Sequence, residues 1–553
     1  MRPLLERLGG FLPAAIALAL PTAFLPGAVD SFILPRASLV IIGACLGVGV
    51  ALLAPGGPGL GRLRVPLMAA IAATILAFAF SVSWPLSFAG SYTRYESLPI
   101  RLSYLGLFAG TAWLLRDNRS RSWVVAAFVF GTAVAGAEAF FQLCPALGWG
   151  RVHIPLSLVC SPVSFRPDGN LGNANLLGAL IAMALPLSLA GGLRGGRFVI
   201  AWWVGAAVMA IGLIVSTSRS GGLGALAGCL ALAVFAFRGR KAAVAAVAST
   251  GVVAAALLAI VLSPLRLLNN DPGPIRLQLW PDAVHMVAAR PLTGWGQDAT
   301  GLVFGRFLSA DWLPGITIDR AHSGPLDIGA TQGLIGLVAL SWVLLTVFRS
   351  AWRWRFTGRV GPLAAACVGY TVWVLFNFDW APATGAFWLL AGTAWSGIRA
   401  AETEQLSRAP DTASPADASA AVRNRATLRS LGAVGLALVA VWLGALPVLA
   451  DVWYFHGRLD LSVVVDPVQA HYHRLLGESL VATGAVSRGV DEMRLAARLG
   501  EPDPWLYLEL GDGEQRLGES SQARSDYRAA LAIDPYFAPA RQRLTSTAGD
   551  AAP

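Results

Sequence analysis

The chain of 553 residues is 55% hydrophobic and only 13% charged, and its mean hydropathy is +0.60. This composition excludes an ordinary soluble protein and indicates an integral membrane protein. The formal net charge of +10 does not indicate a nucleic-acid-binding protein, because much of the excess lies in short connections between apolar segments rather than on one soluble face. We therefore expect membrane lipids as neighbours and no nucleic acid.

Apolar segments long enough to cross a hydrocarbon core of about 30 Å, which takes roughly 20 residues, recur along most of the chain. The pattern predicts an all-α fold, a polytopic membrane helical bundle of about 12–13 spans. The predicted spans cover residues 11–29, 37–54, 65–83, 98–115, 123–143, 173–193, 198–217, 220–237, 242–263, 324–348, 361–378, 382–399 and 429–450.

Basic residues in the connections predict the topology, because cytoplasmic loops retain arginine and lysine while short translocated loops lose them. One side holds Arg2, Arg7, Arg62, Arg64, Arg116, Arg119, Arg121, Arg194, Arg197, Arg238, Arg240, Lys241, Arg349, Arg353, Arg355 and Arg359. This distribution places the N-terminus in the cytoplasm and the long polar loop 264–321 outside, in the periplasm of a Gram-negative cell. An odd number of spans places the C-terminal end outside as well.

The same pattern predicts four regions. Residues 1–400 form the membrane domain with the outer-face loop 264–321, and residues 401–428, rich in Ala, Ser, Asp and Pro, form a flexible cytoplasmic linker. The last span covers 429–450, and a helical C-terminal tail covers 451–547. Within the long loop, an amphipathic helix is expected to have Leu277, Trp280 and Val284 on its apolar face, with His285 in a structural role.

The C-terminal tail contains a repeat of 34 residues, the tetratricopeptide period, because Leu476-Gly477 recurs as Leu510-Gly511. Small, aromatic and helix-stop residues of the second copy stand where such a repeat requires them: Gly518, Ala523, Tyr527, Ala530 and Pro535. The first copy has Met493 at the aromatic position. Two repeats are marginal alone, so packing against the membrane domain or a partner is expected, and both a docking surface and a structural extension remain open.

The five cysteines show no CxxC or Cys/His zinc spacing, so no metal site is expected. Cys144 and Cys160 lie in or beside one outer loop, where an oxidising compartment would allow a disulfide. Two unpaired small residues near the membrane are the equally open alternative.

Arginines on the outer side depart from the positive-inside trend: Arg94, Arg151, Arg166, Arg219, Arg276, Arg290, Arg306 and Arg320. The planar guanidinium fork matches phosphate oxygens, so the outer face could hold a phosphate-bearing substrate. For any single arginine, the alternative is a lipid headgroup or a partner among Glu96, Asp168, Asp282 and Asp319. Arg219 lies in a very short turn between two long spans, which brings its head near the membrane surface.

His322 stands where the long loop re-enters the membrane, and histidine is suited to take a proton near neutral pH. A helix-capping or interfacial role is the alternative. Glu138 lies within the fifth span, and an intramembrane carboxylate is a functional candidate by default.

Four stretches resemble the O-antigen ligase and polymerase superfamily of bacterial membrane glycosyltransferases. Residues 165–175 are similar to its R-x-x-G-x-x-G-N-x-N segment, and 216–221 to its short S-R-[SG]-G turn. Residues 276–280 with 290–296 resemble R-x-x-x-W…P-L-x-G-x-G, and 321–323 with 333–336 resemble A-H-N…G-x-x-G. Ser323 departs from the usual asparagine.

The resemblance implies a GT-C-like, metal-independent, inverting glycosyltransferase without a cofactor, which transfers glycan from undecaprenyl diphosphate to an acceptor hydroxyl at the outer face of the inner membrane. The acceptor would be lipid A core, another glycan or a protein. His322 would be the general base, or would orient the acceptor. Arg219 and Arg276, then Arg166 and Arg94, would hold the diphosphate. Secondary candidates are Arg290, Arg320, Asn173, Asn175 and Glu138.

Two other functions fit some of these features. A secondary transporter would also have many apolar spans, but internal repeats and interrupted helices are not evident. A non-catalytic scaffold of a polysaccharide export complex, contacting assembly proteins through the tail, would leave the outer arginines and His322 unexplained. Replacing His322 separates these hypotheses, since a scaffold should tolerate it.

Overall fold

A computed structural model describes residues 2–54, 59–143, 166–262, 273–407 and 420–549 of the chain. The elements of these residues are helices, with no strand among them, which confirms the predicted all-α class. Cys144 and Cys160 lie outside the described residues.

The predicted spans coincide with helices of the bundle, and the last span is continuous through a π-helical turn, η6. Eight of the described helices are both long and apolar enough to cross a membrane, which confirms a polytopic membrane protein. The bundle helices are α1 (Arg2–Thr22), α2 (Ile33–Leu53), α3 (Arg64–Ala79), α5 (Leu98–Leu114), α6 (Asn118–Leu143), α7 (Ala174–Arg194), α8 (Val199–Ser216), α9 (Arg219–Ala236), α10 (Gly239–Leu262), α12 (Gly324–Arg353), α13 (Val360–Val374), α14 (Ala381–Ser407), α15 (Ala420–Val439), η6 (Ala440–Ala445) and α16 (Leu446–Phe455).

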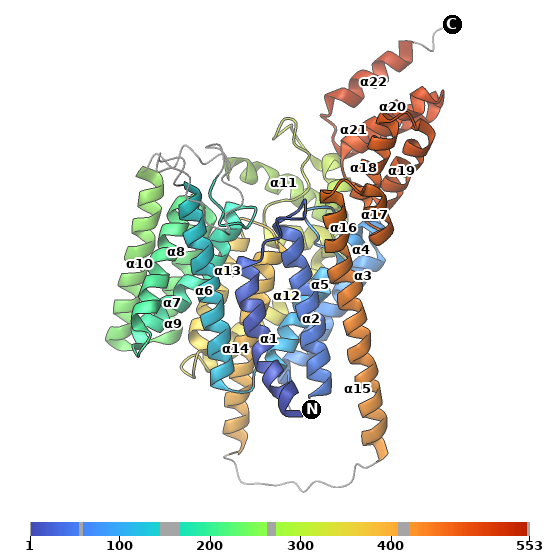
Figure 1. The fold of residues 1–553 in the computed structure, drawn as a ribbon. Coiled ribbons are helices and arrows are strands. Elements are labelled where there is room, and N and C mark those ends of the chain that lie inside the picture. Colours follow the sequence, from blue (N-terminus) through green and yellow to red (C-terminus); the bar gives the residue numbers. More distant parts are fainter. Residues whose placement is uncertain (1, 55–58, 144–165, 263–272, 408–419, 550–553) are drawn as a thin grey trace.

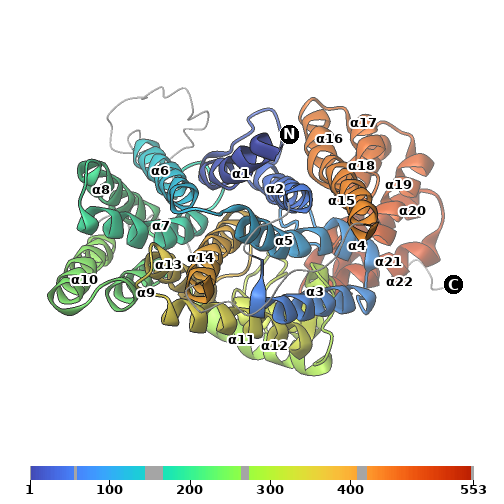
Figure 2. The same cartoon turned by 90° about the horizontal axis from the view of Figure 1, so that it is seen from below.

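Helix α7 lies in the interior of the bundle, packed against α8, α9 and α13 (Figure 2). Its side chains are apolar on all sides, as expected for a helix that is buried all round. Glycines allow the neighbouring backbones to approach closely, since a Cβ atom at Gly369 of α13 would lie 2.4 Å from the carbonyl oxygen of Ala182 in α7. The bundle core therefore depends on small residues where α7, α9 and α13 meet.

The connections sort to the two ends of the bundle (Figure 1). One end of the bundle carries residues 273–321 of the long loop, the short helix α4 (Trp84–Ala89) and the tail. We refer to this end as the outer end. The N-terminus, the C-terminal end of α14 and the N-terminal end of α15 lie at the opposite end of the bundle. This arrangement agrees with the predicted placement of loop and tail on one side, whereas which side faces the periplasm stays a prediction.

Three helical elements occur in the described part of the long loop: α11 (Gly273–Ala289), η4 (Ala299–Leu302) and η5 (Phe304–Phe307). The predicted apolar face of α11 was wrong, because Leu277 and Val284 are exposed. The buried side instead carries Leu279, Ala283 and Met286, which pack against residues of η4, η5 and the start of α12.

Both ends of the predicted linker 401–428 are helical, since α14 continues to Ser407 and α15 begins at Ala420. Alanine, glutamate and arginine dominate both ends, and these residues favour helix. The division of the chain into domains stays a prediction.

The tail contains six helices: α17 (Leu459–Val465), α18 (Ala470–Ala482), α19 (Val486–Leu499), α20 (Pro504–Arg516), α21 (Ser520–Ile533) and α22 (Ala538–Gly549). Helices α20 and α21 start 34 residues after α18 and α19. Gly477 packs on Met493 in the first helix pair, and Gly511 packs on Tyr527 in the second. The two pairs thus repeat one packing arrangement, and their assignment to the tetratricopeptide family stays a prediction.

The tail packs on the outer end of the bundle. Gly305 of η5 lies directly under α21, where a Cβ atom would be 2.0 Å from the carbonyl oxygen of Ile533. Gly500 lies against Ser83 and Leu86 beside α4, and Gly301 of η4 lies against Pro502. The membrane domain thereby supplies a packing surface that two repeats lack by themselves.

Candidate active site

Strained backbone conformations concentrate at the outer end. Non-glycine residues with left-handed φ angles, in the residues the structure describes, are Thr93, Tyr95, Asn170, Thr217, Asp298 and His322. Each lies in, or within a few residues of, a segment with a predicted site residue. Such conformations cost free energy, of order 1–3 kcal/mol each, and persist where the surrounding structure holds them, often at functional sites.

Arg166 joins two of the sequence motifs. Its guanidinium donates to the carbonyl oxygen of Ser216 (3.0 Å) and to Oδ1 of Asn175 (3.3 Å). Ser218 donates to the same Asn175 oxygen (2.9 Å) and caps α9, while Asn173 caps α7. The 166–175 segment and the 216–219 turn therefore form one rigid unit, whose exposed side chain is Arg219.

Arg36 supports this unit from within the bundle and was not predicted. It is fully buried and donates to four carbonyl oxygens, among them those of Leu20 (2.9 Å) and Asn170 (2.8 Å). Glu138 is also buried and acts on Arg36 as a nearby opposite charge. An arginine directly before the predicted span 37–54 was the available sequence signal, and α2 begins earlier, at Ile33. Glu138 interacts with Arg36 and with Asn170, and its part in a reaction stays a prediction.

The start of α11 brings the two principal arginines together. The guanidinium of Arg219 lies against Gly273, 2.7 Å from where a Cβ atom would be. One helical turn later, Arg276 donates to the carbonyl oxygen of Phe376 (2.6 Å), in the connection between α13 and α14. The first turn of α11 thus links Arg219 to the 376–380 segment.

His322 and Arg94 meet around Phe378 of the same segment. The His322 ring contacts the Phe378 ring edge-to-face with a centroid distance of 5.2 Å. The guanidinium carbon of Arg94 lies 5.1 Å from the centroids of both Phe378 and Trp380. Arg94 also forms a two-pronged pair with Asp319, at 2.7 and 3.3 Å. The predicted base and a predicted cation therefore share one aromatic neighbour.

Arg320 is a structural cation rather than a surface one. It is 1% exposed and forms an ion pair with the equally buried Asp298. Burial lowers the pKa of Arg320 to about 10, which still leaves it charged at neutral pH. Asp298 also accepts hydrogen bonds from the backbone N–H and the hydroxyl of Ser91 (2.7 and 3.1 Å). The pair anchors the backbone that leads into His322.

Arg290 lies elsewhere on the long loop. Its guanidinium stacks over Trp295, 4.8 Å from the ring centroid, and donates to the carbonyl oxygen of Phe80 (3.2 Å). These contacts fix the end of α11 against the end of α3.

A buried ion cluster beneath the 376–380 segment was missed by sequence reasoning. Arg101 of α5 pairs with Glu96 (3.1 Å) and with Asp379 (2.5 Å). Tyr104 donates to Glu96 (2.5 Å), and Tyr370 donates to Asp379 (2.7 Å). Burial raises the pKa of Glu96 to about 7. Asp379 stands between Phe378 and Trp380, so the cluster holds the segment on which His322, Arg94 and Arg276 converge.

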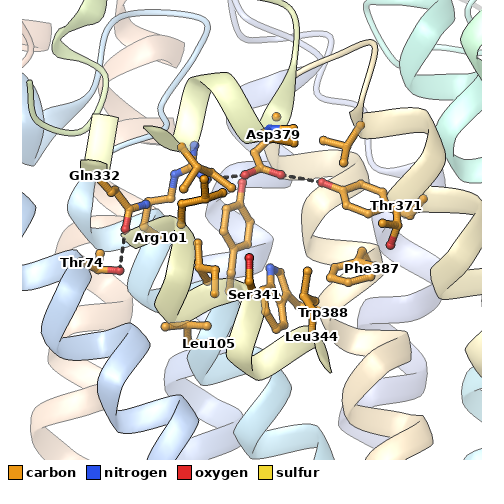
Figure 3. Close-up of a pocket in the computed structure, with 18 of the residues that line it drawn as sticks. Thr74, Arg101, Leu105, Gln332, Ser341, Leu344, Thr371, Asp379, Phe387 and Trp388 are labelled. Carbon is orange, nitrogen blue, oxygen red and sulfur yellow. Dashed lines mark hydrogen bonds and ion pairs between the residues drawn. The ribbon is translucent and has the colours of Figure 1, made fainter. Parts of the chain in front are cut away.

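A cavity of about 150 Å³ opens beside this cluster, between α3, α5, α12, α13 and α14 (Figure 3). Arg101 and Asp379 form its polar end, and most of the wall is apolar, including Leu105, Leu344 and Trp388. Gly324 and Pro325, which follow His322 closely, also line it. The cavity is thus a mostly apolar space whose wall includes residues that follow the candidate base in the chain.

No group of three or more His, Cys, Asp or Glu side chains arranged to hold a metal ion is found within the described ranges. The candidate active site consists of cations, one histidine and aromatic side chains.

The helices and the site define a polytopic, all-α membrane protein with a cationic, histidine-containing site at one end of its bundle. Residues 204–341 match the family model described as O-antigen ligase. The predicted likeness to the O-antigen ligase and polymerase superfamily is thus confirmed over this segment, which contains Arg219, Arg276 and His322. The family implies an enzyme of glycosyl transfer with a lipid-linked glycan donor. No match to the chain is found among the curated proteins.

Proposed function

We propose that the chain transfers glycan from undecaprenyl diphosphate to an acceptor hydroxyl at the periplasmic face of the bacterial inner membrane. The observation that carries this proposal is the convergence of Arg219, Arg276, Arg94 and His322 around α11 and the 376–380 segment. In this topology the N-terminus lies in the cytoplasm, and the outer end and the tail lie in the periplasm.

Arg219 and Arg276 would bind the diphosphate. When the bond between the sugar carbon and the phosphate oxygen breaks, the electron pair goes to that oxygen, and negative charge develops on the leaving group. Fixed guanidinium groups stabilise such charge in a site that excludes water. Arg166 holds the turn that presents Arg219, and Arg94 supplies a third cation beside His322.

His322 would take the proton of the acceptor hydroxyl as that oxygen forms the new bond to the sugar carbon. Attack opposite the leaving diphosphate inverts the configuration at that carbon in a single step. The left-handed backbone of His322 and its contact with Phe378 would hold the imidazole in place, next to Gly324 and Pro325 of the cavity wall. No metal takes part in this scheme.

The cavity beside the buried ion cluster would receive the first isoprene units of the donor. Most of its wall is apolar and one end holds Arg101 and Asp379, which suits a lipid that carries a charged head. The donor diphosphate would then lie between the cavity and Arg276. The acceptor, whether lipid A core, another glycan or a protein, would approach from the outer end beside the tail.

The test uses a deletion strain complemented with wild type, His322→Ala or Arg219→Ala, with the surface polysaccharide profiled on gels and protein amounts measured by blot. Matched controls are His285→Ala and Arg306→Ala, which replace exposed residues of the same loop. We expect loss of about 10²-fold or more of product from the site variants at normal abundance, with both controls active. Full activity of His322→Ala and Arg219→Ala would contradict the proposal and favour a transporter or scaffold.

The deletion strain itself separates ligase from polymerase. Lipid-linked chains of full length that accumulate in the deletion strain identify a ligase, whereas single lipid-linked repeat units identify a polymerase. Export-assembly proteins that contact the tail would be recovered by crosslinking from the tail helices.

A further inference from the structure

One buried carboxylate connects segments that are distant along the chain. Asp451 lies in α16 at the outer end of the last span and is fully buried. It accepts hydrogen bonds from the hydroxyls of Tyr92 (2.6 Å) and Tyr472 (3.1 Å) and from the backbone N–H of Asp30 (2.8 Å). The last span, the tail, the α1–α2 connection and the segment before α5 thus meet at one side chain.

The segment before α5 carries Arg94, and we call residues 90–97 the Arg94 turn. Thr93 and Tyr95, on either side of Arg94, both have left-handed φ angles, of 70° and 56°. Residues with a Cβ atom hold this conformation only when neighbouring structure imposes it. The geometry of Arg94 therefore depends on the contacts of the turn.

The tail and its junction supply one set of these contacts. The ring of Tyr92 stacks on His471 of α18 with a centroid distance of 4.2 Å and an interplanar angle of 11°. Gln469, the residue before α18, donates to the carbonyl oxygen of Gly90 (3.3 Å). Together with the bond from Tyr92 to Asp451, these contacts hold the first half of the turn.

The candidate active site supplies the opposite set. Arg94 pairs with Asp319, the indole N–H of Trp380 donates to the carbonyl oxygen of Thr93 (3.1 Å), and Ser91 donates to Asp298. The Arg94 turn is thus clamped between the tail junction and the residues that lead into His322.

We propose that Asp451 is a positioning residue for the transfer reaction: it holds Tyr92, and through Tyr92 the Arg94 turn, so that seating of the tail sets the place of the Arg94 guanidinium. The inference rests on the proposed function, in which Arg94 is the third cation that stabilises the donor diphosphate. It makes the tail a part of the catalytic unit, beyond any role in docking partners.

The first measurement is the affinity of the purified full-length chain in nanodiscs for undecaprenyl diphosphate. Asp451→Asn and Tyr92→Phe keep the size of their side chains, and Tyr92→Phe also keeps the stacking on His471. Asp460→Asn is the matched control, because this carboxylate is exposed and pairs only locally with Arg458. We expect roughly tenfold weaker binding from both test variants, with the control at wild-type affinity.

A double-mutant cycle separates positioning from a general structural effect. In an Arg94→Ala background, Asp451→Asn should weaken binding no further, because the group through which it acts is already gone. A loss that is equally large with and without Arg94 would overturn the positioning role. So would wild-type affinity of Asp451→Asn and Tyr92→Phe.

The outcome also distinguishes this inference from the function on which it rests. Absence of binding by the wild-type chain, together with an active His322→Ala variant, overturns both. Binding by the wild-type chain, loss of product in His322→Ala, and unchanged binding by Asp451→Asn overturn the positioning role alone.

Discussion

The α7–α9–α13 core and the outer end of the same bundle are held together by different interactions. In the core, small residues let apolar helices touch, as at Gly369 against Ala182, and α7 has no charged residue before Arg194 at its end. At the outer end, buried ion pairs and left-handed residues hold polar loops in place, as with Arg320 and Asp298. Tight apolar packing stabilises the fold as a whole. Buried ions and strained backbone cost free energy of folding, so they are retained where they hold functional side chains in a fixed position.

The largest effect should come from adding volume to the core. Gly369→Leu places a side chain against the α7 backbone, where even a Cβ atom would lie 2.4 Å from an oxygen. We expect loss of most folded protein in membranes. A few added methylene groups already cost about 1–3 kcal/mol in a well-packed core, and a leucine here adds four carbon atoms against backbone, which cannot rotate away. The measurement is protein abundance and detergent-solubilised monodispersity.

The control for this prediction is Gly251→Leu on α10, where no heavy atom lies within 4 Å of the added Cβ position. It should leave abundance unchanged. Normal folding of Gly369→Leu would contradict the close approach of α13 to α7.

A smaller and localised effect should follow from Asp298→Asn. The substitution removes the ion-pair partner of the buried Arg320, while the opposite charges of Asp327 and Glu96 remain nearby. The cost should therefore stay below the about 3–5 kcal/mol of an uncompensated buried charge. Hydrogen exchange should rise in the Arg94 turn and in residues 318–324, while α7 keeps its protection. An equal rise of hydrogen exchange in α7 and at the outer end would show that the Arg320–Asp298 pair stabilises the whole bundle and not the outer end alone.

Arg276→Lys should affect catalysis with little change in stability. Lysine keeps the charge but loses the planar fork that contacts the Phe376 carbonyl and would contact the diphosphate. We expect product formation to fall by about 10²-fold, as for removal of one fixed donor to a developing anion. The measurement is glycan product per amount of protein, with the exposed Arg306→Lys as control.

The smallest effect concerns pH and the tail. Burial raises the pKa of Glu501 to about 7, near Arg474 and the carboxylates of Glu478 and Asp503. Because the folded tail favours the protonated carboxyl, its stability should fall as the pH rises from about 4.5 through about 7. In the full chain, amide hydrogen exchange of α18 to α20 should therefore become faster, relative to unfolded peptide, as the pH rises through this range.

Glu501→Gln should remove the part of that pH dependence that comes from Glu501, while Asp466, Glu509 and Asp526, whose pKa values burial also raises, keep their part. It should stabilise the tail by on the order of 1 kcal/mol at pH 8, where wild type must ionise a buried group. An unchanged slope in Glu501→Gln would assign the pH dependence to another carboxyl of the tail.

The helical spans could be predicted from sequence because an apolar run of sufficient length is a local property. The buried face of α11 could not be predicted in this way. Leu279, Ala283 and Met286 have helical spacing just as Leu277, Trp280 and Val284 do, and only η4, η5 and the start of α12 decide which stripe is covered. Two equally good periodicities carry no information about what lies beside the helix.

Much of the candidate site could also be predicted, since its motifs are contiguous. Arg219, Arg276, Arg94 and His322 were expected and do lie around α11 and the 376–380 segment. The buried ion cluster of Arg101, Glu96 and Asp379 was not predicted, because Arg101 and Asp379 are 278 residues apart in the chain. A single charge in or beside an apolar span indicates that a partner exists without identifying it.

The sequence by itself determined the membrane class, the helical content, the motif residues and the 34-residue spacing of the tail, all of which depend on local composition or periodicity. The tertiary structure alone decided which cations are buried in ion pairs and which are presented, and it seated the tail on the Arg94 turn through Asp451. The physical reason is that ion pairing and close packing join groups hundreds of residues apart. Their free energies depend on burial and distance that only the folded chain defines.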